Sequence, residues 1–291
     1  MSITTGGPVT ASVPFADTGE DIGIERPRRS ARRRFSIPGW YRLLSPVAVL
    51  VLWQVASASG LVSPEKVPSP IDVWRTAVEL ATTDSPAYGT LQGALAASLE
   101  RMAEGFLLGV AVAMILAVIA GLSRVGETVV DPLMQMIRTV PLFGLVPVFI
   151  VWFGIGQQPK LLLIALGAGI PLYLNTFAGI RGVDPKLVEA GRMLGLNRPQ
   201  MLRHVVLPGA LPQILVGIRQ SLGAAWLSLV VAEQLNTKAG LGFLINQATQ
   251  FLQNDVIFVA LIVYTILGLL TDWMVRIAER RALAWRHELV G

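Results

Sequence analysis

Long apolar stretches recur along the chain and are separated by short polar segments. Four of them contain no Asp, Glu, Lys or Arg, and they reach or approach the roughly 20 residues that a helix needs to cross a bilayer. Two later stretches carry one or two charged residues each. The pattern predicts an all-α protein, a polytopic membrane helical bundle with six transmembrane helices at about 43–64, 105–123, 139–159, 161–180, 209–235 and 256–275.

Composition agrees with this class. The chain is 53% hydrophobic and 15% charged, and its mean hydropathy is +0.59, which excludes a soluble globular domain of 291 residues. It contains no Cys, no G-x-x-x-x-G-K-[ST] phosphate loop and no His-Glu-x-x-His motif. We therefore expect no catalytic residue, no metal ligand and no cofactor bound by this chain itself.

Lys and Arg are distributed unevenly between alternate connecting segments. With the N-terminus inside, seventeen of them fall in inner segments and four, Lys66, Arg75, Lys160 and Lys238, in outer ones. Because positively charged loops stay in the cytoplasm, both termini are expected there. The basic stretch 26–34 would then contact anionic lipid head groups, and the pI near 10.0 needs no nucleic-acid partner.

The same pattern predicts the domain organisation. Residues 1–39 form a basic, disordered cytoplasmic tail, residues 40–285 form the transmembrane domain, and residues 286–291 form a second cytoplasmic tail. In the outer connection 63–97, an amphipathic surface helix is expected, with an apolar stripe at Ile71, Trp74, Val78 and Ala81. That helix either packs on the membrane surface and the spans or docks an outside partner.

Two groups of helix-breaking or small residues have structural interpretations. Gly105 and Gly109 are four residues apart, a spacing typical of close helix packing. The third and fourth spans are interrupted by Pro and Gly, which serve either packing or a kinked, moving pathway. These residues are Pro132, Pro141, Pro147, Gly154, Gly156, Gly167, Gly169 and Pro171.

The cytoplasmic segment 183–208 carries clear signals for two short helices. Asp184 followed by Pro185 is a favourable N-cap and first-turn pair, and Gly195 is the residue type favoured at a helix end. A second helix should follow the turn at 197–199 and run to about Val205, with Pro208 breaking the chain before the next span. The first helix would present a small, apolar face that another surface could approach, formed by Leu187, Ala190, Gly191 and Leu194.

The spacing in this segment carries a resemblance to a known family. It reads Glu189-Ala190-Gly191, three residues, Gly195, nine residues, Val205, one residue, Leu207-Pro208. It resembles the permease subunits of bacterial ATP-binding-cassette (ABC) importers, with Gly191 in place of the second Ala and Val205 in place of Ile in the family signature. Further stretches are similar to the subgroup that serves aliphatic sulfonates, taurine and nitrate: Pro68-Ser69-Pro70, Trp152-Phe153-Gly154-Ile155-Gly156, Ala232-Glu233 and Gly240-Leu241-Gly242.

The resemblance implies a type I importer permease in a bacterial inner membrane. It implies a homodimer, two ABC ATPase subunits that bind ATP and Mg²⁺, and an extracytoplasmic substrate-binding protein. The solute would be a small anion, first an aliphatic sulfonate, with taurine, nitrate or a heterocyclic precursor left open. The 184–208 loop would couple to the ATPase through Glu189, Ala190, Gly191 and Gly195, with its local structure set by Asp184, Pro185, Leu194, Leu207 and Pro208.

Three ionisable residues lie within or near the predicted spans and are candidates for the translocation path. Arg138 lies about nine residues into its span and Arg219 about eight to ten, which places both roughly 12–15 Å from the inner surface. They either line an anion path, or Arg138 pairs with Asp131 or helix-end carbonyls and Arg219 reaches the membrane surface. Glu233 is either a gate element or, as we favour, an ion-pair partner.

A secondary transporter is the rival class, since it would also be basic inside and interrupted by helix breakers. It would more often show an internal repeat of hydropathy and charge, and the two halves of this chain show none.

Overall fold

The computed structural model describes residues 41–59, 63, 66–235 and 237–283. The predicted tails, 1–39 and 286–291, lie outside the described residues. The chain divides into two compact units, 1–46 and 47–291, and every contact reported below lies within the second unit.

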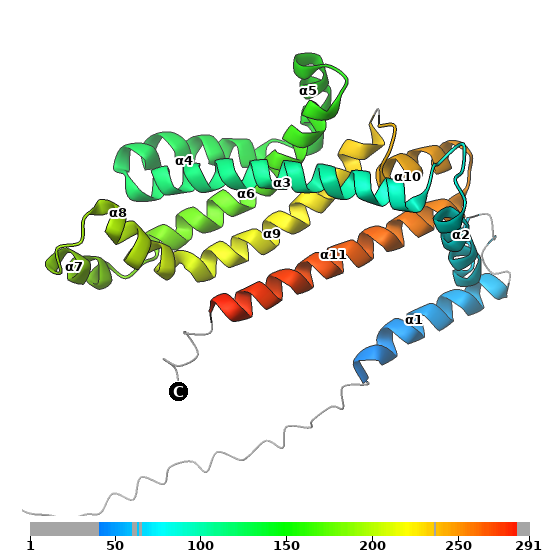
Figure 1. Cartoon of the computed structure of the whole chain (residues 1–291), viewed down its shortest axis with the longest axis horizontal. Coiled ribbons are helices and arrows are strands. Elements are labelled where there is room, and N and C mark those ends of the chain that lie inside the picture. Colours follow the sequence, from blue (N-terminus) through cyan, green and yellow to red (C-terminus); the bar gives the residue numbers. More distant parts are fainter. Residues whose placement is uncertain (1–40, 60–62, 64–65, 236, 284–291) are drawn as a thin grey trace, which may run out of the picture. The chain divides into compact units, whose positions relative to one another are not determined.

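The described residues form helices and no named strand. In chain order the helices are α1 (Tyr41–Ala58), α2 (Pro70–Thr82), α3 (Leu91–Leu122), α4 (Arg124–Thr139), the 3-10 helix Leu142–Leu145, α5 (Val146–Phe153), α6 (Gln157–Arg181), α7 (Pro185–Met193), α8 (Arg198–Met201), the π-helix Leu202–Val206, α9 (Leu207–Gln234), α10 (Leu241–Gln250) and α11 (Asn254–Ala282). The prediction of an all-α membrane protein is confirmed (Figure 1).

Four helices in the described part are long and apolar enough to cross a membrane: α3, α6, the run from α8 through α9, and α11. A fifth span is obtained if α4 and the bent segment after it are counted together. The remaining predicted span falls on α1, whose 18 residues would reach about 27 Å, slightly less than a hydrocarbon core of about 30 Å.

The third predicted span, 139–159, is wrong as a single helix. The polypeptide forms α4 up to Thr139, turns by 93°, and continues through the 3-10 helix into α5. Pro141 and Pro147 lack backbone N–H donors, and Gly154 has a φ of +77° where α5 ends. The Pro and Gly residues therefore break this span rather than kink a continuous helix.

Helices α3, α6 and α9 pack side by side and form the centre of the described bundle (Figure 1). A Cβ atom on Gly109 would lie 2.3 Å from the carbonyl oxygen of Ala165, and one on Gly105 would lie 2.7 Å from Cβ of Ile164. The packing interpretation of these two glycines is therefore confirmed. On the other side of α6, a Cβ atom on Gly217 of α9 would lie 2.9 Å from Cβ of Asn175.

The amphipathic helix predicted in the outer connection is α2. It begins at the cap formed by Ser69, and its buried residues are Val73 and Leu80, which pack into the same core as α11. Thr76 donates a 2.7 Å hydrogen bond to Asp255 at the start of α11. The predicted stripe, including Ile71, Trp74 and Val78, is exposed on the opposite face and available to lipid or to a partner.

Candidate functional site

Segment 183–208, predicted to be cytoplasmic, folds largely as its capping signals predict. The Asp184 side chain accepts a hydrogen bond of 2.9 Å from the Lys186 N–H, and Pro185 occupies the first turn of α7. Gly195 has a φ of +76°, and the N–H groups of Gly195 and Leu196 donate to the carbonyls of Arg192 and Gly191. Helix α7 is therefore closed by a Schellman motif that requires the left-handed conformation of glycine.

The second helix does not break at Pro208. Asn197 and Gln200 form a reciprocal capping box at the start of α8, and α8 continues through a π-turn at 202–206 into α9. Pro208 lies in the first turn of α9, directly after this turn. The π-turn changes the hydrogen-bond register just before Pro208, which has no N–H to donate. The helix therefore continues where a break was expected.

Gly191 faces its own chain rather than an open surface. A Cβ atom on Gly191 would lie 2.8 Å from Cε and 2.9 Å from Sδ of Met201, and Gly191 is the buried residue of α7. The other three residues of the predicted face, Leu187, Ala190 and Leu194, are exposed as expected. The exposed large apolar side chains of this loop are Leu187, Met193 and Leu194, which are 54%, 89% and 80% exposed. We call these three residues the α7 apolar patch; Figure 1 shows α7 and α8 together, at the ends of α6 and α9.

Arg219 is held by acidic side chains of α11. Its guanidinium is paired with Glu279 and lies 3.6 Å from Asp272, and its side chain is 38% exposed. Arg138 is exposed, lies in the last turn of α4, and has no salt bridge among the residues that the structure describes. It is therefore farther along its helix than the nine residues expected. Arg219 and Glu233 are 14 residues apart on one helix, about 21 Å, so the candidate path residues are not brought together.

Glu233 forms an ion pair, as the sequence interpretation favoured. It is 1% exposed and is paired with Arg101, a buried residue of α3. Its carboxylate also accepts hydrogen bonds from Ser98 at 2.7 and 2.8 Å, from Tyr264 at 2.9 Å, and from the backbone N–H of Gly242 at 2.9 Å. We call this set of residues the Glu233 cluster; it joins α3, α9, α10 and α11.

The glycines around Leu241 allow the backbone to approach this carboxylate. Gly240 has a φ of +127°, and a Cβ atom there would lie 2.6 Å from Oε1 of Glu233. A Cβ atom on Gly242 would lie 2.4 Å from Cβ of Glu233. In the sequence, the Gly240-Leu241-Gly242 stretch was only a point of family resemblance. The structure explains its two glycines, because a side chain at either position would collide with Glu233.

The sequence interpretation gave no role to the other members of this cluster. Ser98, Arg101 and Tyr264 lie 135, 132 and 31 residues from Glu233 along the chain. One signal was available: Thr90 is a good N-cap residue, and a helix beginning there would have carried Ser98 and Arg101 into the bundle.

In the described part of the chain, four helices are long and apolar enough to cross a membrane, a further helix pair is bent by 93°, and α7 and α8 form a capped helix pair. This architecture defines an integral membrane protein with several spans. Residues 109–283 match the family described as "Binding-protein-dependent transport system inner membrane component". The chain belongs to this family and is an ABC importer permease.

Relatives extend over most of the chain. It is 44% identical over 265 residues to the aliphatic sulfonates transport permease protein SsuC of Bacillus subtilis, covering 91% of this chain and 93% of that protein. It is also 44% identical to SsuC of Escherichia coli, covering 82% and 89% of the two chains. The taurine transport permease TauC of Escherichia coli is 34% identical, with 83% and 88% covered.

Solved structures support the fold at lower identity. A chain of an amino acid ABC transporter crystallised with histidines has a TM-score of 0.54 at 20% identity, covering 65% of this chain and 92% of that chain. A chain of the MetNI methionine ABC transporter in an inward-facing conformation has a TM-score of 0.52 at 20% identity, covering 64% and 94%.

Proposed function

We propose that this chain forms the membrane path of an importer for aliphatic sulfonates and is driven by a separate ATPase through segment 183–208. The observation that carries the proposal is the α7 apolar patch. A capped nine-residue helix and its C-cap residue expose Leu187, Met193 and Leu194 on a loop that also carries several charged residues, and exposed large apolar side chains of this kind are typical of a protein interface.

The proposed assembly contains two copies of this chain, two ABC ATPase subunits that bind ATP and Mg²⁺, and an extracytoplasmic substrate-binding protein. Its support is the family to which the chain belongs. Closure of the ATPase pair on ATP would draw the two α7 helices together and tilt the attached spans, a rigid-body motion.

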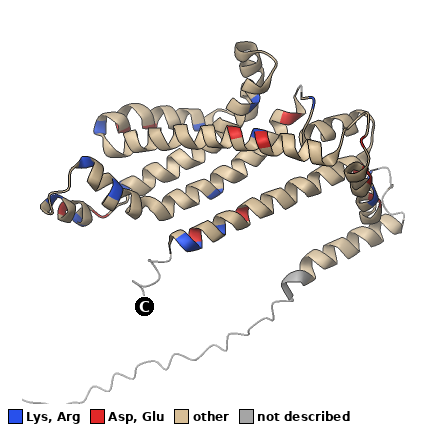
Figure 2. Cartoon of the chain, viewed as in Figure 1, with Lys and Arg blue, Asp and Glu red and all other residues tan. Residues whose placement is uncertain are grey.

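The proposed orientation places α7 and both termini in the cytoplasm of a bacterial inner membrane. Figure 2 shows Lys and Arg positions as blue ribbon on α7, on α8, at the start of α4 and at the end of α11. These positions include Arg124, Lys186, Arg192, Arg198 and Arg280. Such a bias toward one side supports that side as the cytoplasmic one.

The proposed solute rests on the names of relatives. Two proteins that are 44% identical to this chain are named for aliphatic sulfonates, whereas the taurine relative is 34% and a bicarbonate permease, CmpB of Synechococcus elongatus, 31% identical. An aliphatic sulfonate is therefore the first solute to test, with taurine as the alternative.

The experiment measures ATP hydrolysis by the permease reconstituted in lipid with an ABC ATPase and a binding protein encoded near it. We expect ethanesulfonate to stimulate hydrolysis, with weaker stimulation by taurine and nitrate. The double variant Met193→Asp/Leu194→Asp should lose both ATPase co-purification and stimulation, because it places charge in the proposed interface.

Arg75→Gln is the matched control, because Arg75 is an exposed residue of α2, far along the chain from α7. Its contact with Asp72 is a long surface salt bridge of 3.9 Å, so its loss should have little effect. Co-purification of the ATPase with the Asp double variant at the wild-type ratio would contradict the proposed coupling surface. Stimulation by taurine alone would replace the proposed solute.

A further inference from the structure

Three amide side chains form a hydrogen-bonded row across the interface between α6 and α9. The side-chain nitrogen of Asn175 donates a 2.9 Å hydrogen bond to Oε1 of Gln220, and Oδ1 of Asn175 accepts a 2.7 Å bond from Nε2 of Gln213. A Cβ atom on Gly217 would lie 2.9 Å from Cβ of Asn175. One on Gly179 would lie 2.9 Å from Cβ of Gln213, so these two glycines leave room for the amides. We call Asn175, Gln213 and Gln220 the amide row.

The amide row lies at the depth of the membrane. Helix α6 and the run from α8 through α9 are both long and apolar enough to cross a bilayer. Gln220 lies 22 residues from the start of that 37-residue run and 14 from its end, about 33 and 21 Å along the axis. Gln213 and Gln220 are exposed, and lipid offers their N–H groups no acceptor. The row must therefore face water or another polar surface.

The exposed side of α9 differs from that of α3. The exposed residues of α9 fall on one stripe, because they are three, four or seven positions apart: Gly209, Gln213, Gln220, Gly223, Leu227 and Gln234. Among them, Leu227 alone is large and apolar. From Leu107 to Leu122, by contrast, every exposed residue of α3 is apolar. This difference favours lipid around α3 and water along the exposed residues of α9, which we call the α9 stripe.

The amide row has hydrogen-bond donors left over. Among the residues that the structure describes, one N–H of Gln213 and both side-chain N–H groups of Gln220 have no acceptor. A sulfonate offers three oxygen acceptors, and N–H donors bind an ionised acceptor more strongly than a neutral one. Because these donors are uncharged, they would hold the anion weakly, which suits a solute that must leave again.

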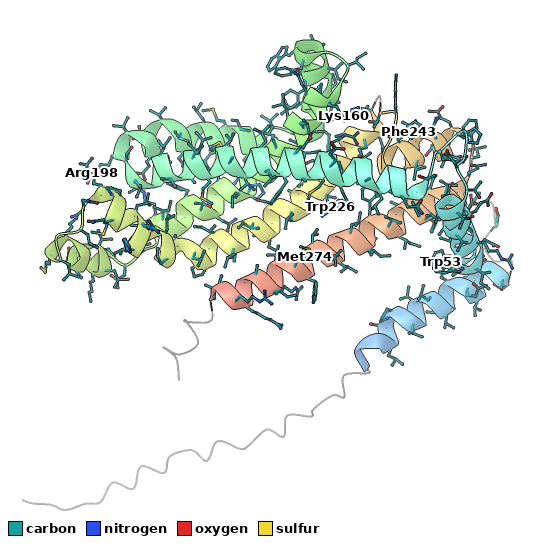
Figure 3. The ribbon with its side chains drawn as sticks, viewed as in Figure 1. Trp53, Lys160, Arg198, Trp226, Phe243 and Met274 are labelled. Atoms are coloured by element: carbon teal, nitrogen blue, oxygen red, sulfur yellow. The ribbon has the colours of Figure 1, made fainter. Side chains whose placement is uncertain are left out.

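We propose that the amide row lines the water-filled path of the permease and donates hydrogen bonds to the sulfonate oxygens of the passing solute. This inference rests on the proposed function and names the residues that contact its solute. Helix α11 covers a different side of α9, where Trp226, labelled in Figure 3, donates a 3.1 Å hydrogen bond to Thr271. Arg219 is also turned to α11, where it pairs with Glu279. The solute would therefore meet Gln220 rather than the guanidinium of Arg219.

Single thiols test whether the α9 stripe faces water, because the chain contains no Cys. Assembled permease–ATPase complexes in lipid are treated with 2-sulfonatoethyl methanethiosulfonate, a charged reagent that carries an ethylsulfonate group and reacts with thiolates. We expect Gln220→Cys to be labelled about tenfold faster than Ile115→Cys, or more, because a thiol in lipid stays protonated. The faster of the rates with and without ATP is compared, since an alternating-access path opens to one side at a time.

Ile115 is the matched control because it is exposed at a similar depth on α3. It is 60% exposed and lies midway between Gly109 and Gly121. These two glycines pack on Ala165 and Ile180 of α6. Ile115 is therefore level with the middle of that stretch of α6, close to its member of the amide row.

A second set of variants tests the contact with the solute. With the binding protein present, Gln213→Leu/Gln220→Leu should lower uptake of ethanesulfonate into proteoliposomes by about tenfold or more, because hydrogen bonds to a charged group are lost. Gln220→Asn keeps the N–H donors and should retain most of the uptake. Gln250→Leu, which removes an exposed amide of α10 outside the stripe, is the matched control. Ethanesulfonate should also slow the labelling of Gln220→Cys, and sodium chloride at the same ionic strength should not.

Equal labelling of Gln220→Cys and Ile115→Cys would overturn the inference. Disulfide bonds between two copies of Gln220→Cys without labelling would also overturn it and would assign the stripe to a contact between copies. Labelling that ethanesulfonate does not slow, or wild-type uptake by the double Leu variant, would overturn the contact with the solute. Gly223→Cys repeats the labelling test if Gln220→Cys fails to assemble, because a Cβ atom there would meet nothing within 4 Å.

Failure of the proposed function has a different sign. No sulfonate would then stimulate ATP hydrolysis by the wild-type complex with its binding protein present, even where Gln220→Cys is labelled from water.

Discussion

The Glu233 carboxylate is held out of water by donors from three other helices. Arg101 and Ser98 come from α3, Tyr264 from α11, and the N–H of Gly242 from α10. Removing one partner of a buried ion pair leaves the other charge uncompensated, which costs about 3–5 kcal/mol. The local stability of this end of the bundle therefore depends on a pair whose members are distant in sequence.

Arg101→Met should lower the free energy of unfolding by about 3–5 kcal/mol, because Glu233 stays buried without its cation. The double variant Arg101→Met/Glu233→Gln should lose much less than the sum of the two single variants. The measurement is SDS-induced unfolding of the permease in bicelles.

A surface pair provides the control. Arg75 and Asp72 are 3.9 Å apart and their side chains are 77% and 55% exposed, so Arg75→Met should change stability by less than about 1 kcal/mol. An Arg101→Met protein as stable as this control would show that the buried pair contributes no net stability.

At the scale of elements, the close approach of α3 to α6 depends on two glycines of α3, Gly105 and Gly109, which have no side chain to hold the helices apart. Gly109 lies against the backbone of Ala165, so Gly109→Ala must push the two helices apart. We expect a loss of about 1–3 kcal/mol, typical of overpacking a dense interface, measured by the same unfolding titration.

Gly268 is the matched control for this prediction, because it is also helical and a Cβ atom there would meet nothing within 4 Å. Gly268→Ala should be neutral or should stabilise α11 by up to about 1 kcal/mol through helix propensity. Equal effects at the two glycines would mean that α3 and α6 are free to separate.

Local signals made many elements predictable from sequence. The caps at Asp184 and Gly195 gave the bounds of α7 to within two residues, and the apolar runs located α6, α9 and α11. The start of α3 was missed because Glu100, Arg101 and Glu104 interrupt its apolar run. Charged residues can lie inside a helix when distant partners compensate them, and the sequence alone does not show those partners.

The broken third span and the continuous helix at Pro208 show a second kind of limit. Both segments contain Pro, yet one turns by 93° and the other passes through a π-turn into α9. Proline removes one N–H donor in either case. Whether the chain then bends depends on the hydrogen bonds and packing around it, which are tertiary properties.

The run from α8 to the end of α9 connects the two sides of the whole molecule. It is one helix of 37 residues, about 55 Å long. One of its ends contacts α7, and the other carries Glu233 and so reaches the Glu233 cluster. A displacement of α7 is therefore expected to reach the Glu233 cluster as movement of a continuous helix, with the π-turn at 202–206 as the place where it bends.

The absence of Cys in the sequence allows the orientation of the whole molecule to be tested directly. A single thiol can be placed at Met193, which is 89% exposed, or at Lys238, which is exposed on the connection between α9 and α10. If α7 is cytoplasmic, a membrane-impermeant maleimide should label Lys238→Cys in cells with a permeabilised outer membrane and should label Met193→Cys only after the inner membrane is opened. Because one helix, α9, joins the two positions, they must lie on opposite sides if it spans the membrane. Labelling of Met193→Cys alone in cells with an intact inner membrane would reverse the proposed orientation, and labelling of both would contradict a membrane-spanning α9.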